Sequence, residues 1–325
     1  MRRLILFFIS FTAIGWFNAL MAQDQFALAP SLPARIEIHA LPTQTLSAEA
    51  FLTGSGQGKS HILAAELKIP QGKRTKFPAV ILMHGSGGIG SDIEPWTHAL
   101  NAAGFATLVV DSFSGRGITN TIQDQTQLNS LAMVFDGYRA LNLLSKHPRI
   151  DASKISIMGF SKGAVASIFS ASTRFTALYG GGDKFASHIG LYTPCNTRVM
   201  GDTDVTGAPM RFFHGTTDDY VSVKPCRIFV NELKAKSVDA TLTEFDNTEH
   251  AYDVPMYPGK VPLPQAQSTR NCLFVEKNEG RLINADTGAP FSYSDSCIET
   301  GAHIGYNPDS TAKTVKSVIE FLKSL

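Results

Sequence analysis

The sequence predicts an α/β domain with a mostly parallel central sheet and helices on both faces. Apolar, strand-like runs alternate with helix-like stretches along most of the chain, and such alternation is typical of parallel sheets with helical crossovers. The 325 residues are 43% hydrophobic and 18% charged, an ordinary composition for a globular protein. Because no internal repeat or low-complexity segment interrupts the pattern, we expect residues 23–325 to form a single domain.

The expected elements follow from short apolar runs and from longer stretches with helical periodicity. Strands are expected at residues 35–40, 62–69, 79–83, 105–110, 154–158, 188–192, 210–213 and 240–245. Helices are expected at residues 94–103, 127–145, 161–171, 224–236 and 310–325. In a parallel sheet the binding crevice lies beyond the carboxyl ends of the strands. We therefore expect functional residues in the loops that leave these strands.

Residues 1–22 have the features of a secretory signal peptide. Arg2 and Arg3 precede an apolar stretch that ends near Phe17, and small residues precede the polar Gln23. The alternative is a membrane anchor, but a span needs roughly 20 apolar residues and this stretch is shorter. We expect cleavage after Ala22 and a secreted or periplasmic chain with no stable membrane insertion.

The balanced charge argues against two classes of partner. The formal net charge is +1, and the sequence has no run rich in lysine and arginine. Proteins that bind nucleic acids or anionic membrane surfaces usually carry such basic patches, so we expect neither as a partner. The sequence leaves the oligomeric state open.

Four cysteines lie in the mature part of the chain, at positions 195, 226, 272 and 297. In an oxidising compartment an even number permits two disulfides. We favour Cys195 with Cys226, which would flank neighbouring strand ends, and Cys272 with Cys297, which bracket one loop-rich segment. Other pairings and buried free thiols are the alternatives. Their spacing lacks the C-x-x-C clusters of zinc sites, and no metal is expected.

Residues 159–163 read G-x-S-x-G, with Ser161 at the centre. A strand-like run, residues 154–158, precedes them and a helix-friendly run, residues 164–169, follows, which is the context of a nucleophile elbow. Such a turn exposes the serine oxygen above the sheet. Because a serine hydroxyl alone is a poor nucleophile, this interpretation requires a histidine base, a carboxylate that orients it and donors for the oxyanion.

A carboxylate and a histidine follow at suitable places. Asp218 lies on the loop after the apolar run 210–213 and is our choice for the orienting acid. Its neighbour Asp219 is the rival, and the alternative role for Asp219 is that of a helix N-cap. His250 follows the last strand and is our choice for the base, with His303 as the main competitor. Five other histidines fall in predicted strands or helices or directly beside them and need no catalytic role: His39, His61, His98, His147 and His188.

The oxyanion donors are expected at two backbone amides. One is the N–H of Lys162, directly after the nucleophile. The other belongs to the glycine-rich loop that follows the strand at residues 79–83, where Ser86 is the first choice and Gly87 the next. A phosphate-binding loop is the alternative here, but the sequence lacks the G-x-x-x-x-G-K-[ST] pattern.

Residues 253–304 are rich in Pro, Gly, Asn and Ser and show no convincing periodicity. A long irregular segment in a compact domain is usually functional or mobile. Because it directly follows His250, we expect a loop-rich insertion that lies over the mouth of the active-site pocket, closed by its own disulfide.

Five stretches occur in the order typical of one known family: residues 79–88, 111–117, 159–163, 215–221 and 249–253. Together they resemble the dienelactone hydrolase family of α/β-hydrolases, over roughly residues 78–253 and the last helix. The resemblance implies the α/β-hydrolase fold, cleavage of esters or lactones, and no cofactor. It assigns the catalytic triad to Ser161, Asp218 and His250.

Two departures from that family change the expected reaction. The dienelactone hydrolases proper use a cysteine nucleophile and a nearby glutamate, whereas this chain has Ser161 and the loop His84-Gly85-Ser86. Ordinary serine esterase chemistry is therefore expected in place of the namesake reaction. The resemblance also suggests that Arg116 binds an anionic group on the substrate. The alternative for Arg116 is a bond to a local carboxylate or to water.

The sequence thus predicts a serine hydrolase that cleaves small-molecule carboxylic esters or lactones through an acyl-enzyme. An acyltransferase or a peptidase with the same triad is one alternative. A non-catalytic binding protein on the same scaffold is the other.

Overall fold

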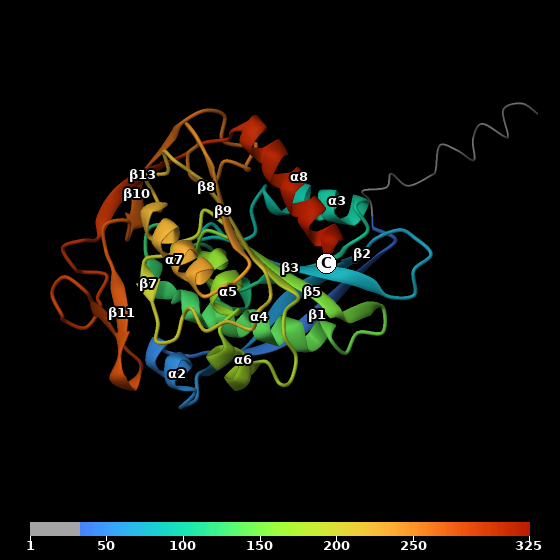
Figure 1. The fold of residues 1–325 in the computed structure, drawn as a ribbon, viewed down its shortest axis with the longest axis horizontal. Coiled ribbons are helices and arrows are strands. Elements are labelled where there is room, and N and C mark those ends of the chain that lie inside the picture. The colour runs from blue at the N-terminus through green and yellow to red at the C-terminus, as the bar shows by residue number, and fades with distance from the viewer. Residues whose placement is uncertain (1–32) are drawn as a thin grey trace, which may run out of the picture.

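The computed structural model describes residues 33–325, so the expected signal peptide lies outside the described residues. Its main feature is an eight-stranded sheet in the order β1-β2-β4-β3-β5-β6-β8-β9 (Figure 1). The strands are β1 (Arg35–Thr45), β2 (Lys59–Ile69), β3 (Phe77–Met83), β4 (Ala106–Asp111), β5 (Ile150–Phe160), β6 (Ser187–Leu191), β8 (Met210–Gly215) and β9 (Ala240–Phe245). Neighbours from β4 to β9 are parallel, whereas β1, β2 and β4 pair antiparallel.

Helices cover both faces of this sheet. On one face lie α3 (Ile93–Ala102) and α8 (Pro308–Ser324), and on the other lie α4 (Ser130–Leu144), α5 (Lys162–Phe169) and α7 (Lys224–Ala235) (Figure 1). The short helices are α2 (Ala48–Thr53), α6 (Thr173–Tyr179), η1 (Ser114–Arg116), η2 (Gln125–Gln127) and η3 (Asn278–Gly280). The predicted fold class is therefore confirmed, and every predicted strand and helix has a counterpart.

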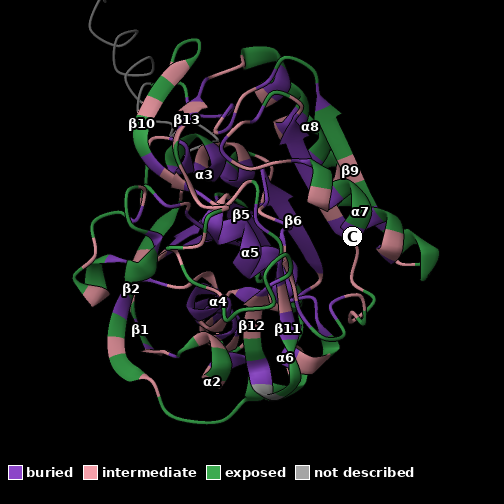
Figure 2. Cartoon of the chain, turned by 90° about the vertical axis from the view of Figure 1, so that its left-hand side faces the viewer, coloured by how far each residue is buried: buried purple, intermediate pink, exposed green. Residues whose placement is uncertain are grey.

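The core follows from the alternation of side chains along the strands. In β3, Val80 and Leu82 belong to the hydrophobic cluster that includes Trp96 of α3. Ile81 and Met83 point to the other face of the sheet, into the cluster that includes the buried residues of α4. All of β3 beyond Pro78 is buried, because a central parallel strand is covered on both sides. Figure 2 shows this buried centre under exposed outer elements.

Residues 253–304 contain more regular structure than their composition suggests. Strands β10 (Val261–Ser268) and β13 (Glu299–Ile304) pair antiparallel, and β11 (Phe274–Lys277) lies between β12 (Arg281–Asn284) and β7 (Thr197–Arg198). These strands are short, and prolines within β10 interrupt its pattern, which explains why no periodicity was evident in the sequence.

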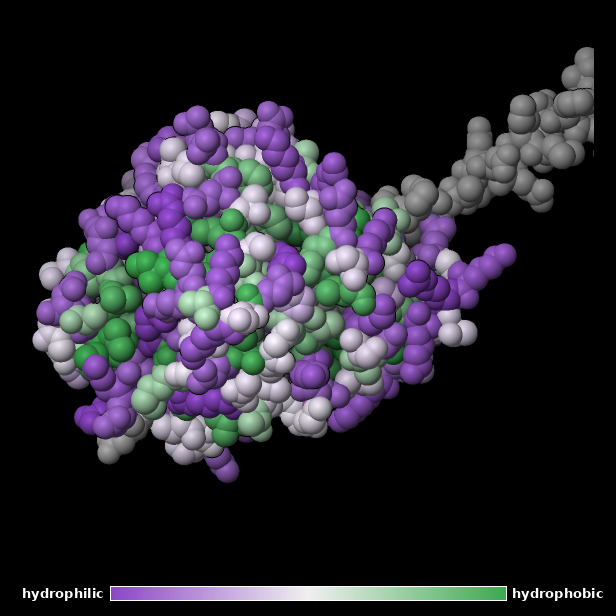
Figure 3. Space-filling view, viewed as in Figure 1, coloured by the Kyte–Doolittle hydropathy of each residue, from purple (hydrophilic) through white to green (hydrophobic). Residues whose placement is uncertain are grey.

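Two disulfides join Cys195 to Cys226 and Cys272 to Cys297, the pairing that the sequence favours. Within residues 33–325 no cysteine is free. No helix in this part of the chain is both long and apolar enough to cross a bilayer. The face in Figure 3 mixes hydrophilic and hydrophobic residues.

Candidate active site

Ser161 lies at a sharp turn between β5 and α5. Its φ of 51° is in the left-handed region, which is uncommon for a residue other than glycine. The two flanking glycines allow the turn. A Cβ at Gly159 would lie 2.1 Å from the carbonyl oxygen of Gly163, and a Cβ at Gly163 would lie 2.1 Å from that of Met83. The G-x-S-x-G pattern thus has the tight strand-to-helix geometry expected of it.

Ser161, His250 and Asp218 meet in series above the carboxyl ends of β5, β8 and β9. Ser161 Oγ lies 3.0 Å from His250 Nε2, and His250 Nδ1 lies 2.7 Å from Asp218 Oδ2. A carboxylate only accepts hydrogen bonds, so Nδ1 carries the proton and Nε2 is free to accept from the serine. The arrangement is that of a nucleophile, a base and an orienting acid.

The Asp218 carboxylate is buried and held by several donors. Its Oδ1 accepts from the backbone N–H groups of Tyr220 (2.9 Å) and Val221 (2.8 Å). Its Oδ2 is also 3.2 Å from Nε2 of the buried His214. Burial alone would raise the pKa of Asp218, but its electrostatic interaction with His250 and the hydrogen bonds from His214 and His250 lower it well below the usual range. The carboxylate is therefore ionised at neutral pH.

His250 lies between two aromatic rings, Tyr192 and Tyr220, with centroid distances of 4.6 and 4.9 Å. The hydroxyl of Tyr192 donates to Asp253 Oδ1 (2.8 Å), and the indole N–H of Trp96 donates to Asp253 Oδ2 (2.7 Å). These contacts restrict the imidazole to one orientation.

A second acid, Asp92, lies at the start of α3 and lines a cavity that also contains Ser161 and His250. Burial and, to a smaller extent, the nearby charge of Asp253 together raise the pKa of Asp92 to about 7. Sequence reasoning missed Asp92 and Asp253, since nothing in the sequence brings residues so far apart together.

The glycine-rich loop after β3 is braced from below by His84. Its Nδ1 donates to the carbonyl of Gly85 (2.8 Å) and its Nε2 accepts from the backbone N–H of Ser112 (3.1 Å). Burial lowers the pKa of His84, which keeps the ring neutral. The loop residue Ser86 borders both cavities that contain Ser161. Lys162 is the first residue of α5, where a backbone N–H has no partner within the helix, so its amide is available beside Ser161.

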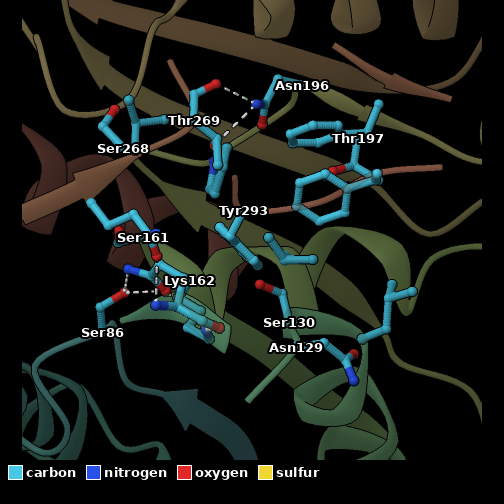
Figure 4. A pocket seen from close by; sticks show the side chains of 18 of the residues that line it. Ser86, Asn129, Ser130, Ser161, Lys162, Asn196, Thr197, Ser268, Thr269 and Tyr293 are labelled. Atoms are coloured by element: carbon cyan, nitrogen blue, oxygen red, sulfur yellow. Dashed lines mark hydrogen bonds between the residues drawn. The ribbon is translucent and has the colours of Figure 1, made fainter. Parts of the chain in front are cut away.

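Two cavities flank Ser161. The larger holds about 910 Å³ of unfilled space, open solvent included. Figure 4 shows Ser86, Ser161 and Lys162 at one end of it and Asn196 and Thr269 at the other. Tyr293, from the segment 253–304, projects between them. This segment therefore forms part of the cavity wall.

The side chain of Lys162 is buried in the wall of the same cavity. Its Nζ donates to Gln125 Oε1 (2.9 Å), and Gln125 Nε2 donates to Ser86 Oγ (3.0 Å). Burial lowers the pKa of the Lys162 amine to about 7. Gln125 was not expected from the sequence, because it lies in a short 3₁₀ turn that carries no recognisable motif.

The rival candidates, Asp219 and His303, bind each other. His303 donates its backbone N–H to Asp219 Oδ1 (2.7 Å), and its Nδ1 lies 2.7 Å from Asp219 Oδ2. Both side chains are more than a third exposed. This contact joins β13 to the loop that carries Asp218.

Arg116 does not line either cavity that contains Ser161. Its guanidinium binds both carboxylate oxygens of the buried Asp136 (2.7 and 2.9 Å), and donates also to Thr45 Oγ1 and the Ser112 carbonyl. With the side chain 2% exposed, this placement does not fit the substrate-binding role suggested for Arg116. It matches the alternative of a bond to a local carboxylate.

Comparison with known proteins gives one family. The model of the Dienelactone hydrolase family matches residues 63–325. Comparison with curated proteins gives no match.

Among solved structures, a dienelactone hydrolase-like promiscuous phosphotriesterase from metagenomic libraries is similar, with a TM-score of 0.57 and 14% identity over 89% of this chain and 98% of that one. A protein from Klebsiella pneumoniae subsp. pneumoniae, assigned as a dienelactone hydrolase, has a TM-score of 0.55 and 13% identity over 90% of this chain and 100% of that one. At such identities the likeness concerns the fold.

Proposed function

Because this chain belongs to the dienelactone hydrolase family, we propose that it is a serine hydrolase that cleaves carboxylic esters or lactones. The observation that carries the proposal is the continuous series from Ser161 Oγ through His250 to Asp218, with distances of 3.0 and 2.7 Å. Hydrolysis of esters is the coarser activity that family membership supports.

The proposed reaction has two halves. Ser161 Oγ attacks the ester carbonyl while His250 Nε2 takes its proton, and Asp218 stabilises the imidazolium that forms. The backbone N–H groups of Lys162 and Ser86 are the proposed donors to the oxyanion, and losing one such donor typically costs about 10²–10³ in kcat. His250 then protonates the leaving alcohol, and water, activated by the same imidazole, hydrolyses the acyl-enzyme.

The proposed compartment is outside the cytoplasm. Two disulfides are typical of oxidising compartments and rare in the cytosol. Together with the signal-like residues 1–22 they support secretion or a periplasmic location. Cell fractionation and amino-terminal sequencing test this proposal, and the exported protein should begin at Gln23. An uncleaved chain found in the cytoplasm would contradict it.

Labelling with a fluorophosphonate tests the mechanism. We expect a covalent adduct on Ser161 in the wild-type protein and none in Ser161→Ala. The matched control is Ser170→Ala, because Ser170 Oγ also lies beside a buried histidine, His188 (3.2 Å), but outside the cavities. The control should label like the wild type.

Hydrolysis of short-chain and aromatic esters, measured on the same three proteins, should follow the labelling. A folded wild-type protein that takes up no label would overturn the proposal and favour a binding protein. Products formed with added alcohols or amines distinguish hydrolysis from acyl transfer, and cleavage of peptides with no cleavage of esters would favour a peptidase.

A further inference from the structure

A second group of chemically capable side chains lies at the β1 edge of the sheet, away from Ser161. Glu37 and His39 are two residues apart on β1, and such residues point to the same face of a strand. His147 joins them from the turn between α4 and β5. Strand β1 is four strands away from β5, which leads into Ser161, and this corresponds to roughly 19 Å across the sheet. The group is therefore separate from the candidate active site.

One carboxylate oxygen faces two imidazole nitrogens. Glu37 Oε2 lies 3.1 Å from His39 Nε2 and 3.2 Å from His147 Nε2, and all three atoms lie within 4.8 Å of one another. The three side chains are only 15%, 23% and 11% exposed. His39 Nε2 is inaccessible to solvent and has no hydrogen bond of good geometry. Its lone pair or proton thus lacks a proper partner.

These distances suit a tetrahedral metal ion. Zinc binds histidine nitrogen and carboxylate oxygen at about 2.0–2.2 Å, which places neighbouring ligand atoms roughly 3.4 Å apart. The remaining oxygen of the carboxylate, Glu37 Oε1, is held by Arg35 Nε at 2.8 Å, so Oε2 is oriented toward the histidines.

Binding would cost two contacts of His147, one of which is the hydrogen bond that its Nε2 now donates to Glu37 Oε2 (3.2 Å). His147 Nδ1 now accepts from the backbone N–H of Arg149 at 3.2 Å, so the ring proton is on Nε2. A metal at Nε2 moves that proton to Nδ1 and breaks the Arg149 contact. His39 loses no hydrogen bond on binding.

We propose that Glu37, His39 and His147 bind a zinc ion that ties β1, an edge strand of the main sheet, to the turn before β5. Three protein ligands leave a fourth position for water. Within residues 33–325, this is the one group of three or more His, Cys, Asp or Glu side chains gathered so closely. The cysteines there are all in disulfides and do not compete for the ion.

Zinc titration of the metal-free protein against a chromophoric chelator tests the proposal. We expect one equivalent of tightly bound Zn²⁺ in the wild type. His39→Ala and His147→Ala should each weaken its binding at least about tenfold, since loss of even an outer partner of a metal ligand costs that much. The matched control is His98→Ala, because His98 contacts one carboxylate, Glu94 (2.9 Å), rather than a three-residue group. It should bind zinc like the wild type.

Thermal unfolding gives a second readout. A ligand that binds only the native state stabilises it, so Zn²⁺ should raise the Tm of the wild type and of His98→Ala but not of the two variants. Mg²⁺, which prefers oxygen ligands, should leave every Tm unchanged. Where an alanine variant fails to fold by circular dichroism, the near-isosteric Glu37→Gln replaces it. Equal zinc affinity in wild type and folded variants, or no bound zinc at all, would overturn the proposal.

Discussion

Two neighbouring aspartates each hold a histidine at the same distance, yet the two pairs differ in nearly everything else. Asp218 contacts His250 and Asp219 contacts His303, both at 2.7 Å. The first pair has side chains that are 0% and 4% exposed, and the second pair has 39% and 38%. Only the first histidine also reaches Ser161. Under the proposed mechanism, proton transfer therefore depends on burial and on the contact with Ser161, because both pairs share the Asp–His contact.

The exposed pair has a different use. Asp219 fixes the backbone and the ring of His303, and so joins β13 to the loop that carries Asp218. Arg270 adds to this connection through the Asp219 and Gly301 carbonyls. An exposed ion pair typically contributes 0–1 kcal/mol to the free energy of unfolding. We therefore expect this pair to position the segment 253–304 rather than to take part in proton transfer.

The largest expected effect comes from the histidines. We expect His250→Ala to lower kcat about 10⁴–10⁶-fold, because loss of the base removes most of the catalysis in enzymes of this mechanism. His303→Ala should stay within about tenfold of the wild type. Steady-state ester hydrolysis measures both. Equal losses in the two variants would show that the buried pair has no special role.

The next effect comes from the aspartates. Asp218→Asn should lower kcat about 10³–10⁴-fold, because an amide in place of the carboxylate favours the wrong tautomer of His250. Asp219→Asn keeps the size of the side chain and should cost less than about tenfold. If Asp219→Asn proved the more damaging change in the same assay, the assignment of the acid would move to Asp219.

Part of the fold and of the candidate site could be predicted from the sequence alone. The parallel sheet, the elbow at Ser161 and the loops carrying Asp218 and His250 were predictable, because local pattern and chain order specify them. The choice of Asp218 over Asp219 was only a preference, because two adjacent residues of the same type give no indication of which one is buried. Residues 253–304 looked irregular because β11 and β12 have only four residues each and because prolines interrupt the pattern of β10.

The partner of Arg116 could not be identified from the sequence for a similar reason. Asp136 lies 20 residues later, within α4, and a salt bridge between them is visible only in three dimensions. The group formed by Glu37, His39 and His147 could not be predicted for the same reason, because His147 is far from the other two residues in the sequence.

Asp92 extends the comparison, because the charged group beside this aspartate is another acid, Asp253, rather than a histidine. The pKa of Asp92 is raised to about 7 by burial and by Asp253, against about 3.9 in an unfolded chain. Its contribution to stability is therefore present below about pH 4 and lost as pH rises to about 7. We expect Asp92→Asn to lack this loss and to gain a few kcal/mol relative to the wild type between pH 5 and 7.5.

Urea unfolding of both proteins across this range measures the effect of Asp92. The difference between the two curves is the relevant quantity, because burial lowers the pKa of His84 and His188, and these groups titrate in the same window with the opposite sign. Parallel curves would contradict the assignment of a proton to Asp92.

The smallest expected effect is the coupling between Asp219 and His303. A double-mutant cycle with Asp219→Asn and His303→Ala should give no more than about 1 kcal/mol of interaction energy in the free energy of unfolding. Salt should reduce it, because exposed charges are screened. A coupling of several kcal/mol, unaffected by salt, would mean that this pair is as well shielded as the buried one.

The antiparallel pairing of β10 with β13 means that the chain leaves the body of the protein and returns to it at one place, since Val261 and Ile304 are partners in register. The segment between these two residues lines the larger cavity beside Ser161, and β11 within it pairs with β7. A replacement segment of equal end-to-end span that keeps the β7 pairing is therefore expected to change which esters are accepted.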